Sequence, residues 1–359
     1  MNNYVLKLAG TSCNIDCTYC NEKSKSLIYD ENLTVNYIKK IFEYSNHEKV
    51  NILLHGGEPL IIGFQKIKNI LELLKENKNK LGYIKIQTNG LLLDEKYFRL
   101  FFKEFNELEI DISISLDGDS YLNYLRVDYH NNNTTKDIEK VFHLAKKYNK
   151  KIGVLSVINK LHINNTERFI SYFEQYKDNI LFLKFNPLYT SREEIDVDTN
   201  ITPSEYTYFL QNIYKLWINK YLYKYFAIEP LISYIQSFKG IENRKYCEFQ
   251  KNEPYKCFKF KTIYPNGDIA PCDTLSINDF KIGNIFNNTI KYQENNFLED
   301  KKNMNIIDEL NKKCDICDIK DLCGGGCLAQ RKMFLNSDLY EEYCTHRKNM
   351  FHFIANELG

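Results

Sequence analysis

The chain has 359 residues, of which 43% are hydrophobic and 26% are charged, and its formal net charge is +1. This balance is typical of a globular protein and excludes a disordered chain. The near-zero charge disfavours a nucleic-acid surface. No apolar run approaches the ~18 residues that a membrane-spanning helix needs, and the first residues lack the features of a signal peptide. We therefore expect a cytoplasmic protein with neither nucleic acid nor a membrane as its partner.

The first half of the chain alternates short apolar runs with longer amphipathic ones. The apolar runs predict six strands, at Tyr4–Leu8, Val50–Leu54, Tyr83–Gln87, Ile110–Leu116, Ile152–Ile158 and Leu181–Asn186. Helical spacing lies between them, as in Ile138, Val141, Phe142 and Ala145. Such alternation predicts parallel βαβ units. Because six units are too few for an eight-stranded barrel, we expect an α/β fold built as a partial, open (β/α)6 TIM barrel.

Three of the predicted strands end in short polar or glycine-bearing turns. These turns are His55–Glu58, Thr88–Gly90 and Asp117–Gly118. Active sites of barrel folds lie at the carboxyl ends of the strands, so the turns are candidate site elements. The alternative is that each turn is only a tight connection.

The pattern changes near residue 200. Thr202 is a candidate N-cap, with Pro203 at the first helical position and Glu205 completing a capping box. We expect a long helical stretch from there to roughly Gly240, followed by an irregular, cysteine-rich module.

The 11 cysteines fall into two groups, three at residues 13–20 and eight at residues 247–344. A reducing cytosol disfavours structural disulfides, so this clustering predicts metal or cluster ligands. Cys13, Cys17 and Cys20 form C-x3-C-x2-C just after the first predicted strand. Three thiolates can hold three irons of a cubane and leave the fourth iron open to a small molecule. A zinc site completed by a distant residue, or free thiols, is the alternative.

This cysteine loop resembles the signature of the radical S-adenosylmethionine (SAM) family. A second match follows after the next predicted strand. Gly56, Gly57 and Glu58, followed by Pro59, resemble the family's GGEP motif, which meets the amino group of SAM. The resemblance implies a [4Fe-4S] cluster that reduces SAM to methionine and a 5′-deoxyadenosyl radical, which then abstracts hydrogen from an unactivated C–H bond.

Three further positions match SAM contacts of the family. The stretch Ser113–Gly118 resembles the fourth-strand segment, in which Ser115 would reach SAM. Arg126 stands where relatives pair an arginine with the SAM carboxylate, a task suited to a bidentate guanidinium. Leu188, after the sixth predicted strand, matches a position that contacts the adenosine.

Seven cysteines of the C-terminal group have tight spacings. They are Cys257, Cys272, Cys314, Cys317, Cys323, Cys327 and Cys344. Taken alone, with Gly324–Gly326 between two of them, they suit a pair of zinc ribbons as well as iron–sulfur clusters. The full pattern, C-x9-G-x4-C, then C-x2-C-x5-C-x3-C and a last cysteine, resembles the SPASM extension that follows radical SAM domains.

SPASM modules usually bind two auxiliary [4Fe-4S] clusters, so the resemblance implies three clusters in all, with SAM as the other cofactor. The first auxiliary cluster would take Cys247, Cys257, Cys272 and Cys327. The second auxiliary cluster would take Cys314, Cys317, Cys323 and Cys344. If Cys247 is not a ligand, the first auxiliary cluster keeps an open iron. We expect a radical SAM partial barrel at residues 1–200, a helical linker at 201–245 and a small SPASM domain at 246–359.

SPASM proteins mostly modify peptides or proteins, and maturation of a ribosomal peptide by a thioether or carbon–carbon crosslink is the main expectation. Sulfatase maturases usually carry Gln where this chain has His55, and aromatics where it has Asn21 and Glu22. The twelve residues before Cys13 are too few for a leader-binding domain, so a separate leader-binding protein is expected. A flavodoxin or ferredoxin is the expected electron donor.

Anaerobic sulfatase maturation, which oxidises Cys or Ser to formylglycine, is the alternative. Those enzymes use an aspartate directly after an auxiliary-cluster cysteine as general base, and Asp273 directly follows Cys272. A structural role for Asp273, as a loop carboxylate that binds backbone amides, is equally compatible with this position. A non-catalytic metal-binding protein is an alternative of another class, which the complete GGEP and cysteine motifs oppose.

Overall fold

The computed structural model describes residues 2–20, 29–45, 48–189, 197–242, 246–251, 256–275, 277–335 and 337–359. Asn21 and Glu22, used above, lie outside the described residues. The chain forms two units. The first comprises Met1–Ser115, Arg126–Ile152 and Cys257–Met304, and the second comprises Leu116–Leu125, Gly153–Lys256 and Asn305–Gly359. No helix among the described residues is both long and apolar enough to cross a membrane.

The first unit is built on strands in the order β10-β9-β8-β1-β2-β3-β4. Their bounds are β1 (Asn2–Lys7), β2 (Val50–His55), β3 (Leu81–Thr88), β4 (Ile110–Ser115), β8 (Phe260–Ile263), β9 (Asp268–Ala270) and β10 (Gly283–Asn284). Strands β8 and β1 to β4 run parallel, whereas β9 and β10 are antiparallel to their neighbours. The four N-terminal strands lie where the apolar runs predicted them.

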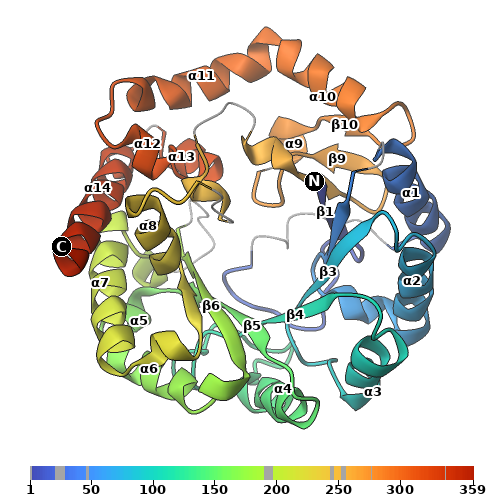
Figure 1. The fold of residues 1–359 in the computed structure, drawn as a ribbon, viewed down its shortest axis with the longest axis horizontal. Helices are drawn as coiled ribbons and strands as arrows, with labels where there is room; N and C mark the ends of the chain where they lie inside the picture. Colours follow the sequence, from blue (N-terminus) through green and yellow to red (C-terminus); the bar gives the residue numbers. More distant parts are fainter. Residues whose placement is uncertain are drawn as a thin grey trace. The chain divides into compact units, whose positions relative to one another are not determined.

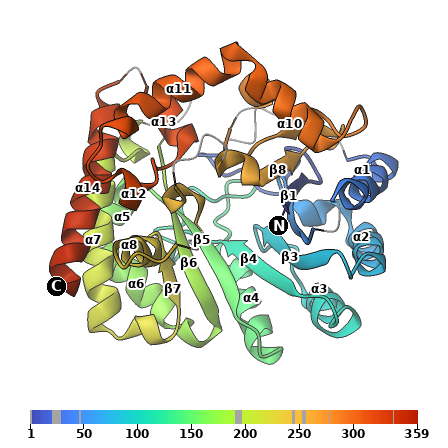
Figure 2. The same cartoon turned by 45° about the horizontal axis from the view of Figure 1, so that its top comes forward.

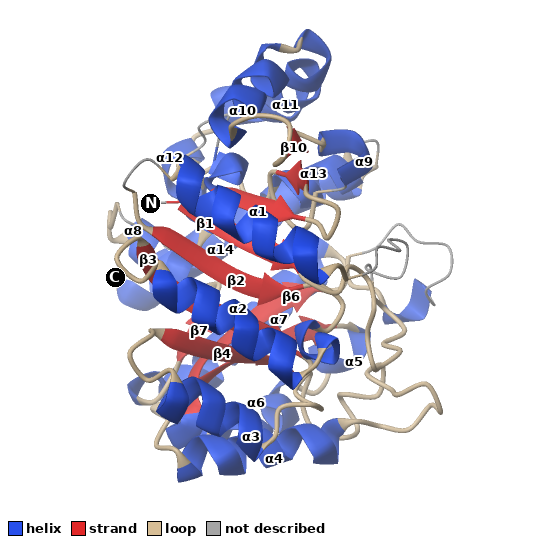
Figure 3. Cartoon of the chain, turned by 90° about the vertical axis from the view of Figure 1, so that its right-hand side faces the viewer, coloured by secondary structure: helices blue, strands red, loops and turns tan. Residues whose placement is uncertain are grey.

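Helices of the first unit pack their apolar faces on this sheet. They are α1 (Glu31–Tyr44), α2 (Phe64–Glu76), α3 (Glu95–Arg99), α4 (Thr135–Lys147), α9 (Ile277–Phe280) and α10 (Ile290–Glu299). Figure 3 shows α1 and α2 lying over one face of β1 and β2. Buried residues recur at helical spacing, as in Tyr37, Ile38 and Ile41 of α1. The predicted apolar face of residues 138–145 is the buried face of α4.

The register of β1 and β2 sets the position of the candidate site. Lys7, the last residue of β1, lies opposite His55, the last residue of β2. The loops that follow these parallel strands therefore leave from one edge of the sheet. The turn after β3 and the end of β4 belong to the same edge, because these strands are parallel to their neighbours as well.

The second unit contains β5 (Ile152–Ile158), β6 (Ile180–Pro187) and β7 (Ala227–Glu229), with β6 and β7 parallel. Its helices are α5 (Lys160–Ile163), α6 (Thr166–Glu174), α7 (Pro203–Asn219), α8 (Leu231–Phe238), α12 (Lys320–Cys323), α13 (Leu328–Phe334) and α14 (Leu339–Leu358). Helix α11 (Lys301–Asp315) contributes to both units. The C-terminal α14 lies along α7, although the two are far apart in the sequence (Figures 1 and 2).

Two expectations about the second half of the chain are corrected. The capping box at Thr202 forms, but the helix that it starts ends at Asn219, and strand β7 interrupts the predicted helical stretch. Pro230 follows β7, and the residue before a proline favours extended backbone. The cysteine-rich module is also less irregular than expected, since it contains β8, β9 and β10. Strands this short leave no clear period in the sequence.

Candidate active site

The N-terminal cysteine loop follows β1 and is tied to the GGEP segment. The Gly57 N–H donates to the Gly10 carbonyl at 2.7 Å, and the Glu58 N–H donates to the Ser12 carbonyl at 2.9 Å. Within the loop, Cys17 is buried, whereas Cys13 and Cys20 are partly exposed. The structure therefore brings together the two motifs that the sequence matched to a cluster loop and a SAM contact.

Glycine is required at position 57 by the close approach of these two segments. A Cβ atom built at Gly57 would lie 2.1 Å from the Ser12 carbonyl oxygen, which is far inside van der Waals contact. Gly56 has φ of +117°, a conformation that side chains disfavour. The two glycines let the GGEP backbone pass directly against the cysteine loop.

We expect Gly57→Ala to displace the cysteine loop, because the colliding atom is backbone and cannot rotate away. Reconstituted Gly57→Ala should retain about four fewer irons than the wild type, one cubane, and should release little 5′-deoxyadenosine. Gly240→Ala is the control for loss of a glycine without a collision: a Cβ there meets no atom within 4 Å, and its φ of +71° adds only local backbone strain, in the second unit. Equal iron content in the two variants would contradict the expectation.

The Glu58 carboxylate joins the turn after β2 to the turn after β3. It accepts hydrogen bonds from the Thr88 hydroxyl (2.8 Å), the Asn89 N–H (2.6 Å) and the Leu60 N–H (3.0 Å). Burial raises the pKa of Glu58 to about 7, although these donors and the Arg126 charge act in the opposite direction. The structure thus gives Glu58 a positioning role, and its predicted contact with SAM stays a prediction.

The titration of Glu58 predicts a pH dependence of stability. The folded protein holds a proton up to about pH 7, whereas the unfolded chain releases it near pH 4.5. Stability therefore falls as pH rises through this window, by at most about 3 kcal/mol. We expect Glu58→Gln to lose this part of the pH dependence, measured by anaerobic urea unfolding at about pH 5 and about pH 8. Glu95→Gln, at an exposed ion pair, is the control. Parallel pH profiles for the wild type and Glu58→Gln would contradict the assignment.

Asn89 contacts the cysteine loop, a role that sequence reasoning did not assign. Its Nδ2 lies 3.5 Å from the Cys13 Sγ and donates to the Asn14 Oδ1 at 2.6 Å. The Tyr129 hydroxyl donates to the Cys13 carbonyl at 3.0 Å. Donors of this kind orient thiolate ligands and modulate their charge. The turn Thr88–Gly90 was a signal for Asn89, whereas no pattern marks Tyr129.

Ser115 and Arg126 lie in the same unit as the cysteine loop. The Gln87 Nε2 donates to the Ser115 hydroxyl at 3.1 Å at the end of β4. Arg126 is buried, and its Nη1 donates to the hydroxyl of Tyr19, a residue of the cysteine loop, at 2.8 Å. The Ser113 hydroxyl, on the same side of β4 as Ser115, is buried without a hydrogen-bond partner among the described residues. Ser113 is thus a further candidate contact.

Leu188 lies in the second unit, one residue after β6. It is buried, and its backbone N–H donates to the Ile158 carbonyl at 2.8 Å. The residue follows a strand end, as the resemblance expects of an adenosine contact, and that contact stays a prediction.

Asp273 lies beside the end of β2, in the first unit. Its Oδ2 is 3.8 Å from the Nε2 of His55, the residue directly before GGEP. The preceding residue, Cys272, accepts a hydrogen bond at its Sγ from the Thr274 N–H at 3.3 Å. The side chains of His55 and Asp273 are both partly exposed. A carboxylate and an imidazole are thus placed together at the edge of the sheet that carries the candidate site.

Four cysteines of the second unit line one cavity, and they are the predicted ligands of the second auxiliary cluster. They are Cys314, Cys317, Cys323 and Cys344. The hollow between these residues is partly open to solvent. Thiolates are the ligands that such clusters take. Among the described residues, no three His, Cys, Asp or Glu side chains lie close enough together to hold a single metal ion.

The predicted ligands of the first auxiliary cluster are divided between the units. Cys257 and Cys272 lie in the first unit, before β8 and after β9. Cys247 and Cys327 lie in the second unit, and the Cys327 N–H donates to the Tyr343 hydroxyl at 2.8 Å. None of the 11 cysteines forms a disulfide. The joint assignment of these four ligands stays a prediction.

The chain resembles known proteins over nearly its whole length. Residues 9–175 match the model of the radical SAM superfamily. The chain is 27% identical to the cysteine-type anaerobic sulfatase-maturating enzyme of Clostridium perfringens (strain 13), over 97% of this chain and 95% of that enzyme.

Solved structures share the fold. The structure of native anSMEcpe with bound AdoMet and the Cp18Cys peptide has a TM-score of 0.82 at 25% identity, covering 99% of this chain and 97% of that one. Streptococcus suis SuiB bound to S-adenosylmethionine has a TM-score of 0.61 at 18% identity, covering 94% and 75%, a likeness of fold alone. The predicted α/β partial-barrel class is confirmed, and the SPASM assignment of residues 246–359 stays a prediction.

Proposed function

Because the chain is an enzyme with a radical SAM domain at residues 9–175, we propose that it oxidises a cysteine or serine side chain of a protein substrate to formylglycine. The observation that carries the proposal is the place of Asp273, which directly follows Cys272 and lies beside His55 at the start of the GGEP segment. The similarity to a sulfatase-maturating enzyme over 97% of the chain supports the same reaction.

Different residues would take part in different steps of this reaction. Cys13, Cys17 and Cys20 would hold the [4Fe-4S] cluster that the family implies, which would supply, together with bound SAM, the radical chemistry that removes a hydrogen atom from the substrate Cβ. Asp273 would accept the proton of the substrate thiol or hydroxyl, since oxidation of that C–H/X–H unit leaves a proton to remove. The remaining electron needs an acceptor, which is the chemistry that auxiliary clusters would supply. A serine substrate would then already be the aldehyde, whereas a cysteine substrate would be a thioaldehyde that water hydrolyses to formylglycine with release of hydrogen sulfide. Gly56, Gly57, Ser115, Arg126 and Leu188 are the proposed SAM contacts.

Maturation of a ribosomal peptide by a thioether or carbon–carbon crosslink is the second candidate. Its support is His55, which occupies a position where sulfatase maturases usually carry Gln. This reaction would use a separate leader-binding protein. Both candidates take a peptide or protein substrate and an electron donor such as a flavodoxin or ferredoxin, and both suit a cytoplasmic enzyme whose cysteines are free of disulfides.

The proposal includes three clusters and three parts of the chain. A SPASM domain at residues 246–359 would follow the partial barrel at 1–200 and the linker at 201–245. Two auxiliary clusters would lie in that domain. The four-thiol cavity of the second unit supports the second auxiliary cluster.

Mass spectrometry of the product tests the proposed function. The reconstituted enzyme is incubated anaerobically with SAM, dithionite and a sulfatase-derived peptide that carries Cys or Ser at the modified position. We expect an aldehyde, which a hydrazide reagent captures, and one 5′-deoxyadenosine for each aldehyde. A product that has lost two hydrogens and does not react with the hydrazide would instead establish the crosslink. Release of 5′-deoxyadenosine without a changed sulfatase peptide would refute the formylglycine proposal.

A further inference from the structure

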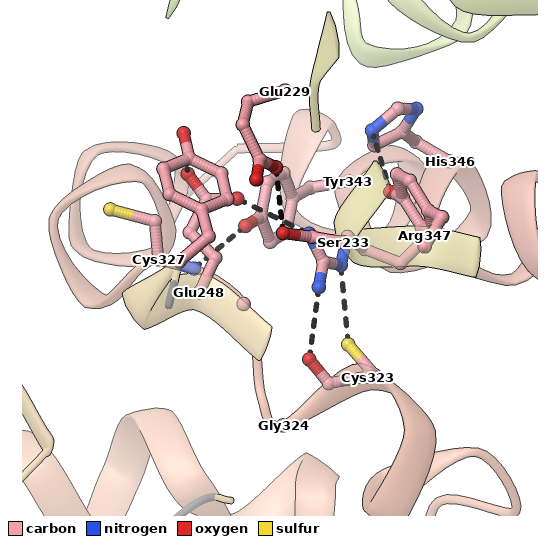
Figure 4. Close-up of polar contacts among 12 residues, drawn as sticks. Glu229, Ser233, Glu248, Cys323, Gly324, Cys327, Tyr343, His346 and Arg347 are labelled. Atoms are coloured by element: carbon pink, nitrogen blue, oxygen red, sulfur yellow. Dashed lines mark hydrogen bonds and ion pairs between the residues drawn. The ribbon is translucent and has the colours of Figure 1, made fainter. Parts of the chain in front are cut away.

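Two buried arginines reach thiols of the four-cysteine cavity. Arg347 on α14 donates from Nε to the Cys323 Sγ at 3.3 Å and from Nη2 to the Cys323 carbonyl at 2.9 Å (Figure 4). Arg331 on α13 donates from Nη1 to the Cys314 Sγ at 3.4 Å. Each side chain belongs to a residue that is only 2% exposed. Two of the four thiols therefore carry a charged N–H···S hydrogen bond.

Both guanidinium groups are held firmly by their surroundings. Arg347 lies over the Phe249 ring at 4.1 Å and the Tyr234 ring at 5.2 Å, and its Nη1 meets the Glu248 carboxylate at 3.2 Å. Arg331 also donates to the Leu310 carbonyl and to the Asn311 Oδ1, which are neutral groups. Among the described residues, Arg331 thus donates hydrogen bonds to these two uncharged groups and to the Cys314 thiol.

Three lysines line the same cavity in a different way. Lys313, Lys320 and Lys348 are 39% to 49% exposed at their side chains. Each forms an ion pair with a carboxylate, of Glu341, Asp315 and Asp318 respectively. Solvent screens such exposed charges. The lysines therefore supply a matched control for loss of a charge without loss of a buried N–H···S bond.

We propose that Arg331 and Arg347 raise the reduction potential of the second auxiliary cluster and so favour it as the acceptor of the electron released by substrate oxidation. This inference rests on the proposed function, in which Cys314, Cys317, Cys323 and Cys344 hold that cluster. One-electron reduction adds a negative charge to the cluster. A buried positive charge stabilises the reduced form more than the oxidised form, and hydrogen bonds to the sulfurs act in the same direction. Both arginines act through cluster ligands and are positioning residues.

A redox titration followed by electron paramagnetic resonance tests the proposal. Arg331→Gln, Arg347→Gln and the control Lys348→Gln are each placed in a full-length parent in which Cys13, Cys17 and Cys20 are alanine. That parent keeps only the auxiliary clusters. At the parent midpoint potential of the affected cluster, we expect each arginine variant to show a roughly tenfold lower ratio of reduced to oxidised cluster. This equals a shift of about 59 mV to more negative potential for one electron. Lys348→Gln should shift much less.

The possible outcomes separate this inference from the proposed function. If the triple-alanine parent protein holds no reducible cluster on the four cysteines, both the arginine inference and the three-cluster part of the proposed function are refuted. If the parent protein holds both auxiliary clusters but the midpoint potentials are unchanged in the arginine variants, only the role of the arginines is refuted. The same holds if Lys348→Gln shifts the midpoint potential as far as the arginine variants do. If a glutamine variant loses about four irons, the midpoint is read from Arg331→Lys or Arg347→Lys, which keep the positive charge but lose the guanidinium N–H···S bond; a smaller shift to more negative potential is then expected, and an unchanged midpoint would refute the role of the arginine. Iron loss from the lysine variants too would show a folding role and overturn the proposal.

Discussion

The variant with alanine at Cys13, Cys17 and Cys20 should release no 5′-deoxyadenosine with SAM and dithionite, whereas the wild type should release it readily. The three thiolates are the proposed ligands of the cluster that reduces SAM, and the loop that carries them is held against GGEP. Without that cluster no electron reaches SAM. Reconstituted wild type should hold about twelve irons and the triple variant about eight, at four irons per cubane.

The four-thiol cavity supplies a matched control for this variant. Alanine at Cys314, Cys317, Cys323 and Cys344 should also remove about four irons, but this protein should still cleave SAM, because these residues lie in the second unit and are the proposed ligands of another cluster. Product from the N-terminal triple variant would refute the assignment of the SAM-reducing site. Stoichiometric zinc with little iron in the wild type would refute the three-cluster proposal.

Asp273→Asn should lower substrate turnover by roughly two to four orders of magnitude, the usual contribution of a general base. The variant should still cleave SAM, because the proposed reductive step uses only the N-terminal cluster. Asparagine preserves the shape of the side chain beside His55 but cannot accept the proton. The measurement is product formation by mass spectrometry, alongside the yield of 5′-deoxyadenosine. SAM cleavage that continues while product disappears is the expected signature.

Asp279→Asn is the control for Asp273→Asn, because it makes the same substitution at an exposed position a few residues further along the chain. It should retain normal turnover. If Asp273→Asn also retains near-normal turnover, Asp273 is not the base. Capture of the substrate thiolate at an open iron of the first auxiliary cluster would then be favoured, and Cys247 would be dispensable.

The sequence by itself determined the parts of this protein that rest on local patterns. The six strands of the βα units lie where their apolar runs predicted, because a buried parallel strand needs a continuous apolar segment. Helix α4 buries the predicted face because its apolar residues recur with the 3.6-residue period of a helix, which places them on one side. The cysteine and GGEP motifs are short and contiguous, so their spacing was visible without coordinates. Local patterns failed where a short strand, β7, interrupted an apolar helical region.

Only the tertiary structure decided which distant residues meet. His55 and Asp273 are brought within 3.8 Å in the first unit, where β8 pairs with β1. Asn89 reaches Cys13, and Arg331 and Arg347 reach thiols of the four-cysteine cavity. Such contacts join segments far apart in the chain and leave no period or fixed spacing in a single sequence. Their geometry follows from strand pairing and helix packing, which only the folded chain specifies.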